Sequence, residues 1–123
     1  MDNPHDLRTR TKSFALNIIR LFSSLPKIPE AQVLGRQLLR SGTSVGAHCR
    51  EAKRARSNAE FISKVEGGLQ ELEETVYWIE LLLDSGILLK DDITGLCKEA
   101  DELLAMMVSS VKTVKARIRN SEL

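Results

Sequence analysis

One short stretch of the sequence carries the residue types of a serine hydrolase. Residues 42–46 read G-T-S-V-G, the letters of a nucleophile elbow, and His48 follows Ser44 by four positions. A hydrolase elbow places its serine on a sharp turn between a strand and a helix, and its acid and histidine follow later in the chain. Here the preceding residues have helical period, and the chain's other histidine is His5. The sequence therefore predicts no catalytic residue and no enzyme, and we expect a Ser44–His48 contact only to satisfy a partly buried imidazole.

Metal and cofactor chemistry is not predicted either. His48 and Cys49 are neighbours that point about 100° apart on a helix, and no second ligand pair at metal-binding spacing completes a tetrahedral site. Glycine-rich phosphate loops of the Walker or Rossmann type are absent from the sequence. Cys49 and Cys97 lack CxxC spacing, which favours two reduced core thiols and a cytoplasmic protein.

A row of cations is the second set of residues that could do chemistry, because arginine and lysine bind phosphate groups. Aromatic residues make up only 4% of the chain and do not alternate with these cations, so a base-stacking platform is not predicted. The alternative is that the cations are solvated or pair with an acidic face further along the chain. The candidate nucleic-acid-binding residues are Arg36, Arg40, Arg50, Lys53, Arg54 and Arg56. The acidic face comprises Glu66, Glu73, Glu80 and Asp84, with Gln70 and Tyr77 between them and Glu71 and Glu74 beside them.

The charges are segregated along the chain although the net charge is only +1. Residues 1–56 contain 11 basic and 4 acidic groups, whereas residues 57–111 contain 3 basic and 12 acidic groups. Surfaces of opposite sign attract each other within a fold, across an oligomer or toward outside ligands. RNA, DNA, a partner protein and a second copy of the chain are therefore all expected classes of partner.

Four segments have the apolar period of helices, and strand-like alternation is absent. The predicted helices lie near residues 6–25, 29–55, 58–85 and 92–118. Ser57 and Glu60 have the spacing of a capping box before the third helix, and Gly86 supplies its stop. The first helix is apolar around most of its circumference, so it must be covered on more than one side. Its apolar residues include Phe14, Ile18, Leu21, Phe22 and Leu25.

Small residues line one stripe of the second predicted helix. They are Gly35, Gly42, Gly46 and Cys49. Each interior glycine costs a helix about 1 kcal/mol relative to alanine, so close approach of another helix is the expected reason for three of them. The alternative is that the residues SGTSVG break the helix into a loop.

Short connections between the helices predict an antiparallel up-down four-helix bundle, an all-α fold. With 123 residues, a single domain over 1–123 is expected. No uninterrupted apolar run approaches the length of a membrane span, so a soluble protein without a membrane partner is expected.

Residues 38–88 resemble a bacterial family of four-helix bundle proteins also called 23S rRNA-intervening-sequence proteins. The letters YWIELL follow the last of the motif residues, and the flanking helices agree with the family in length and character. His48 departs from the family pattern, which usually has asparagine there. The motif residues in this chain are Arg40, Ser44, Glu51, Ser57, Phe61 and Glu74.

The resemblance implies a homopentameric ring without enzymatic activity and without a cofactor. Such a ring would also account for the apolar first helix and the small-residue stripe. A relative of similar architecture is the accessory protein of diversity-generating retroelements, which binds nucleic acid and a reverse transcriptase. That relative is strongly basic, whereas this chain has a net charge of +1.

Overall fold

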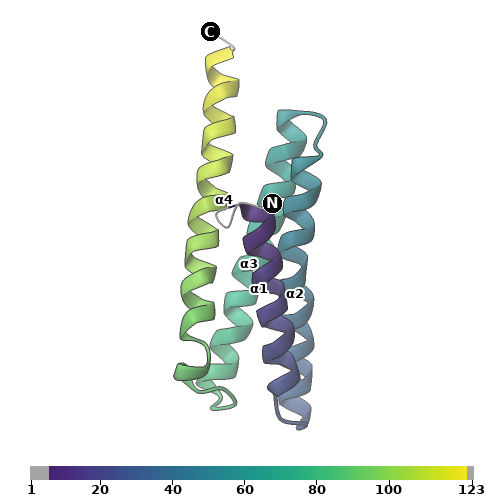
Figure 1. Ribbon diagram of the computed structural model, residues 1–123, viewed down its shortest axis with the longest axis vertical. Coiled ribbons are helices and arrows are strands. Elements are labelled where there is room, and N and C mark those ends of the chain that lie inside the picture. The colour runs from purple at the N-terminus through teal and green to yellow at the C-terminus, as the bar shows by residue number, and fades with distance from the viewer. Residues whose placement is uncertain (1–5, 122–123) are drawn as a thin grey trace.

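The computed structural model describes residues 6–121 and consists of four helices joined by short connections (Figure 1). Helix α1 spans Leu7–Ser24, α2 spans Pro29–Lys53, α3 spans Asn58–Asp84 and α4 spans Thr94–Ser121, and a 3-10 turn, η1, spans Lys90–Asp92. No strand occurs within residues 6–121. The all-α prediction is confirmed.

Side-chain hydrogen bonds cap the first turns of α1 and α3, and a glycine follows the end of α3. The Asp6 carboxylate accepts a hydrogen bond from the Arg8 amide at the start of α1. At the start of α3, the Ser57 hydroxyl accepts a hydrogen bond of 3.1 Å from the Glu60 amide, as the capping-box spacing predicts. The Glu60 carboxylate accepts a hydrogen bond from the Arg56 amide, whereas a capping box would use the amide of Ser57. Beyond the end of α3, Gly86 has φ +80°, a conformation that glycine adopts without steric cost.

The observed helix ends differ from the predicted ones by a few residues. Helix α2 ends at Lys53 and not near 55, because the amides of Arg54 and Ala55 bond to carbonyls three residues back and form a tight final turn. Helix α4 begins at Thr94 and not near 92, because Lys90–Asp92 form the 3-10 turn. It continues to Ser121, three residues beyond the predicted end.

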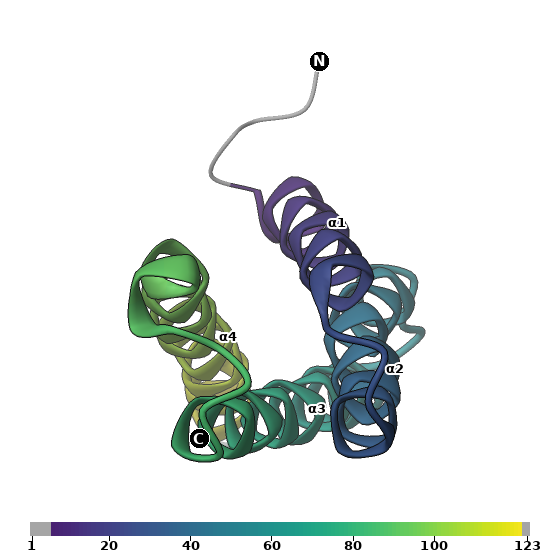
Figure 2. The same cartoon turned by 90° about the horizontal axis from the view of Figure 1, so that it is seen from below.

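The core lies along the axis of the bundle, and all four helices contribute to it. Figure 2 shows the helices following one another around this axis in chain order. The hydroxyl of Thr75 lies inside the core, where it contacts the Ser41 hydroxyl at 2.8 Å and donates to the Glu71 carbonyl. The largest fully buried side chains include Phe14, Ile18, Leu38, Leu72, Ile79, Leu103 and Met107.

Helix α1 packs on the small-residue stripe of α2. The stretch SGTSVG is helical throughout, so the loop alternative is wrong. A Cβ atom added to Gly42 would lie 2.8 Å from Cγ1 of Ile18, and one added to Gly46 would lie 3.2 Å from the hydroxyl of Thr11. Close approach of another helix is confirmed, but that helix belongs to the same subunit. The expectation that contact with further copies of the chain explains the stripe is therefore wrong.

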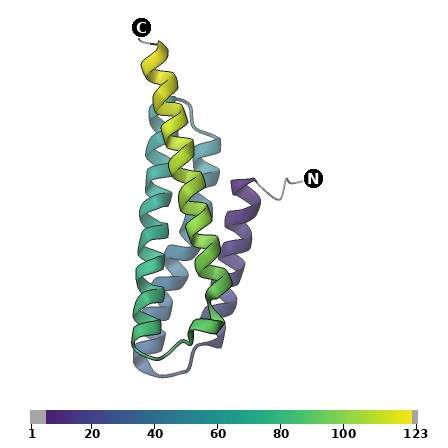
Figure 3. The ribbon, with the colours of Figure 1, turned by 90° about the vertical axis from the view of Figure 1, so that its left-hand side faces the viewer.

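The four helices differ in length, and this difference leaves one end of the bundle incomplete. Helix α1 has 18 residues and α4 has 28, so their lengths are about 27 Å and 42 Å at 1.5 Å per residue. Figures 1 and 3 show the last turns of α4 extending beyond the start of α1. Arg10 holds the start of α1 against α4 through ion pairs with Glu99 and Glu102.

Within residues 6–121, no helix combines the length and apolar character that a membrane crossing requires.

Candidate nucleic-acid interface

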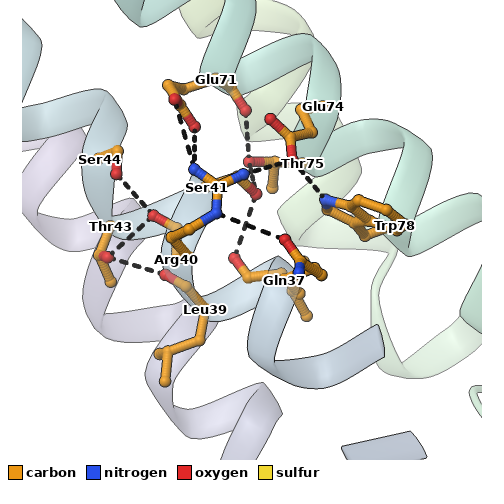
Figure 4. Close-up of polar contacts among 11 residues, drawn as sticks. Gln37, Leu39, Arg40, Ser41, Thr43, Ser44, Glu71, Glu74, Thr75 and Trp78 are labelled. Carbon is orange, nitrogen blue, oxygen red and sulfur yellow. Dashed lines mark hydrogen bonds and ion pairs between the residues drawn. The ribbon is translucent and has the colours of Figure 1, made fainter. Parts of the chain in front are cut away.

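Arg40 is one candidate cation that the fold uses internally. Its guanidinium forms ion pairs with Glu71, at 3.2 Å, and with Glu74, both on α3 (Figure 4). The indole of Trp78 donates to the same Glu74 carboxylate at 3.2 Å. The hydrogen bond to Glu74 raises the pKa of Arg40, and the same bond lowers the pKa of Glu74. Arg40 therefore joins α2 to α3 and is not free to bind phosphate.

The acidic face of α3 forms no ion pair with the cations of α2 within residues 6–121. The acids that pair with Arg40 are Glu71 and Glu74, which the sequence places beside that face. The pairing alternative thus holds for Arg40 alone among the six candidate cations, as far as residues 6–121 are concerned. The acidic face itself, Glu66, Glu73, Glu80 and Asp84, is exposed and forms no ion pair within the same range.

The end of α2 carries a concentration of free cations. Arg50, Lys53 and Arg54 line a hollow of about 490 Å³ together with Arg8, which belongs to the first turn of α1. All four side chains belong to exposed residues, and none forms an ion pair within residues 6–121. We call these four residues the basic hollow. Because like charges gather there without a partner in the described chain, the hollow attracts anions.

The one acid that lines the basic hollow is already neutralised. The Glu51 carboxylate accepts from the ammonium of Lys64, on α3, at 2.9 Å. The bond to Lys64 lowers the pKa of Glu51, and the bond to Glu51 raises the pKa of Lys64. Glu51 therefore stays ionised but is balanced by its own partner, and the hollow keeps its positive character.

Two further candidates lie at different distances from the basic hollow. Arg56 is exposed in the α2–α3 connection, two residues beyond Arg54. Arg36 is also exposed, but it precedes Arg50 by 14 residues, which is about 21 Å along a helix. The predicted row of six cations is thus divided into a cluster at the end of α2, a paired Arg40 and a separate Arg36.

Arg8 is the residue of this site that sequence reasoning missed. It lies 42 residues before Arg50 in the chain, and only the packing of α1 on α2 brings the two together. The signal available in the sequence was the basic run RTRTK near the start of the first predicted helix. That run is separated from the α2 cations by a whole helix and a turn, so spacing alone does not connect them.

The serine and histidine of the elbow-like stretch do not form a catalytic pair. The Ser44 hydroxyl donates to the Arg40 carbonyl at 2.7 Å, within its own helix, and the Ser44–His48 hydrogen bond that the spacing allows does not occur among residues 6–121. The Nδ1 atom of His48 is buried without a hydrogen-bond partner among the described residues. Its ring packs against Gly67 on α3, where an added Cβ atom would lie 3.1 Å from Nδ1. Steric contact with α3 therefore positions His48. Residues 6–121 contain no cluster of three acidic, histidine or cysteine side chains that could hold a metal ion.

The remaining motif residues have structural roles in the subunit. Ser57 caps α3, Glu51 pairs with Lys64, and Glu74 pairs with Arg40. Phe61 is partly buried and packs against the core near the start of α1. The two ion pairs join α2 to α3, the Ser57 cap is local to the start of α3, and Phe61 brings α3 close to α1, so these motif residues have structural roles within the bundle.

Comparison with known proteins shows that the chain is similar to a protein family and to solved structures. A family model described as 23S rRNA-intervening sequence protein matches residues 5–109. A crystal structure of a protein of unknown function, from the S23 ribosomal protein family of Bacteroides thetaiotaomicron VPI-5482, is similar with a TM-score of 0.82. That protein is 34% identical in sequence, and the match covers 87% of this chain and 99% of the other. No curated protein matches the sequence.

Proposed function

The chain belongs to the family of 23S rRNA-intervening sequence proteins, and from this premise we propose that it is a non-enzymatic, homo-oligomeric scaffold that binds nucleic acid through the basic hollow. Its subunit is an antiparallel up-down bundle, and five subunits form a ring, the number that the family resemblance implies. A ring repeats one weak phosphate-binding site several times, and linked sites reach a much higher affinity than one site alone.

The free cations at the end of α2 are the observation that carries this proposal. Arg8, Arg50, Lys53 and Arg54 gather around one hollow, and their only acidic neighbour in its lining, Glu51, is neutralised by Lys64. Nucleic-acid phosphates are the anions that such a repeated cationic surface suits. Phosphate contacts position a protein without reading bases, so binding is largely independent of sequence.

Exposed apolar side chains support the homo-oligomer. Leu16 and Ile19 on the outer side of α1 are 43% and 42% exposed, and Val33 on α2 is 58% exposed. Covering these residues with another copy removes apolar surface from water. Light scattering coupled to size-exclusion chromatography tests the assembly, and a monomer at micromolar concentration would contradict it.

A second candidate function is a protein-binding module, for example an accessory subunit of a reverse transcriptase. Here the cations form salt bridges between subunits. The observation that favours it is the exposed acidic face of α3, where Glu66, Glu73 and Glu80 have no ion-pair partner within residues 6–121. Cations of a neighbouring copy could neutralise this face. In that case little phosphate-binding surface remains.

A titration with single-stranded RNA and DNA at two salt concentrations distinguishes the two functions. If the four cations of the basic hollow each meet one phosphate, affinity falls roughly 50-fold per site between about 50 and 200 mM salt. The variant Arg50→Ala/Arg54→Ala should bind weakly and lose about half of this salt dependence. The matched control is Lys27→Ala/Lys90→Ala, which removes two exposed cations outside the hollow and should bind as the wild type does.

Size-exclusion chromatography of both variants must show an intact oligomer before their affinities are compared. Absence of salt-sensitive binding by the wild-type protein removes the nucleic-acid function. Equal losses in the two double variants would mean that net charge, and not the basic hollow, accounts for binding.

A further inference from the structure

An apolar groove lies where α1 starts too late to cover α3 and α4. Two hollows, of about 570 Å³ and 190 Å³, share Leu7, Phe61 and Ser110 in their lining, so together they form one continuous groove. Met106 and Val114 of α4 add further apolar lining to the larger hollow. Figures 1 and 3 show the last turns of α4 continuing beyond the start of α1. Beyond the start of α1 at Leu7, the described residues 6–121 therefore surround the axis with α2, α3 and α4 alone and leave the fourth position uncovered.

The rim of this groove is basic. Arg117 borders the larger hollow, and Arg8, Arg50 and Lys53 border the smaller one. The acid in the lining is Asp6, whose carboxylate already accepts the Arg8 amide as the cap of α1. The groove thus combines an apolar floor with cations on both sides.

We propose that this groove binds an amphipathic acidic helix of a partner protein, which takes the position that α1 leaves open. From Met106 to Arg117 the groove follows α4 for about 16 Å, the length of three helical turns. A helix of that length presents apolar residues at i, i+3, i+4 and i+7 to the floor. Its acidic residues then face the cations of the rim.

Nucleic acid does not fit the groove as well, and neither do the outer faces of α1 and α3 in a second copy of the chain. Phosphates and base edges need polar partners, but the floor offers the apolar side chains of Leu7, Phe61 and Val114. The outer face of α1 is apolar but carries Lys12 and Arg20, of the same sign as the rim. The outer face of α3 is acidic, and it has no large exposed aliphatic side chain to fill the floor. Its members are Glu66, Gln70, Glu73, Tyr77, Glu80 and Asp84.

The test uses the full-length oligomer and a fluorescein-labelled synthetic peptide, with fluorescence anisotropy as the measurement. The peptide has about 14 residues, enough for nearly four helical turns, with leucines on one helical face and glutamates elsewhere. A scrambled peptide of the same composition tests the apolar face, and a peptide with lysine in place of glutamate tests the charge. Both control peptides should bind at least about tenfold more weakly.

Ser110→Trp fills the groove without changing any charge, because Ser110 lines both hollows. We expect this variant to weaken peptide binding at least about tenfold and to leave RNA binding unchanged. Ser23→Trp, at an exposed position of α1 outside the groove, is the matched control and should change peptide affinity less than about twofold. Thr113→Glu, at an exposed position of the groove wall, provides a second variant that should also weaken the acidic peptide.

Several results would overturn the proposal. The first is that the scrambled peptide binds as tightly as the designed one, and the second is that both groove variants bind the peptide unchanged. The third is that both groove variants dissociate the oligomer, because the groove would then be an interface between copies. The groove shares the cations Arg8, Arg50 and Lys53 with the basic hollow. Loss of RNA binding in Ser110→Trp would also overturn the proposal, because the apolar floor, and not only these shared cations, would then bind nucleic acid. If the peptide binds as expected while the Arg50→Ala/Arg54→Ala variant keeps full RNA affinity, the groove stands and the proposed nucleic-acid function fails.

Discussion

Replacing Gly42 with alanine tests how tightly α1 packs on α2. The added Cβ atom would lie 2.8 Å from Cγ1 and 2.9 Å from Cγ2 of Ile18. Ile18 is fully buried, and its β-branched side chain has a strongly preferred rotamer in a helix, so it cannot turn aside. The change therefore requires α1 to move away from α2.

Two opposing effects set the size of the change. Alanine gains about 1 kcal/mol over glycine in a helix interior. Overpacking of a well-packed core costs about 1–3 kcal/mol. The overpacking exceeds the gain, and we expect Gly42→Ala to lower the free energy of unfolding by about 1 kcal/mol, or Tm by roughly 4 °C.

Thermal unfolding followed by circular dichroism, at one fixed protein concentration, measures these effects. Gly95→Ala is the matched control, because nothing lies within 4 Å of its added Cβ atom, and it should be neutral or stabilising. The change in Tm of Gly46→Ala should lie between those of Gly42→Ala and Gly95→Ala, since the added Cβ atom would lie 3.2 Å from the Thr11 hydroxyl. The double variant Ile18→Ala/Gly42→Ala should lose less unfolding free energy than the sum of the losses in the two single variants, because truncating Ile18 removes the clash with the added Cβ atom. If Gly42→Ala stabilised the protein as Gly95→Ala does, the close packing of α1 on α2 would be refuted.

Two further predictions concern ionisable groups. Arg40→Ala should lower Tm at pH 7, because Arg40 lowers the pKa of Glu74 and so stabilises the folded state. This stabilisation is fully present above the unfolded-state pKa of Glu74 and is lost as the pH falls through its lower folded-state pKa. The difference in Tm between wild type and variant should thus shrink as the pH falls below about 4.5, and a gap independent of pH would contradict the assignment. Burial raises the pKa of Cys49 to about 11, so at pH 8 its thiol should react with a disulfide reagent more slowly in the folded protein than in urea. Equal rates in the two states would show that Cys49 is accessible.

Sequence periodicity was sufficient to predict the helices because helix formation depends on local spacing. The Ser57 cap, the Gly86 stop and the small stripe through Gly42 and Gly46 could all be recognised before any contact was known. The family could likewise be recognised from the sequence, because the motif residues lie close together along two consecutive helices. Exact helix ends were not readable, since the tight final turn of α2 depends on hydrogen bonds that many sequences can form.

Only the tertiary structure decided what the charged side chains do. Residues three or four apart share a helix face by local geometry, but the partner of each side chain depends on the rotation and packing of neighbouring helices. That rotation pairs Arg40 with Glu71 and Glu74. The same packing brings Arg8 to the cations at the end of α2, and the late start of α1 opens the groove above Leu7. The sequence by itself determined the four amphipathic helices, whereas long-range packing selected which of their cations remain free to bind a partner.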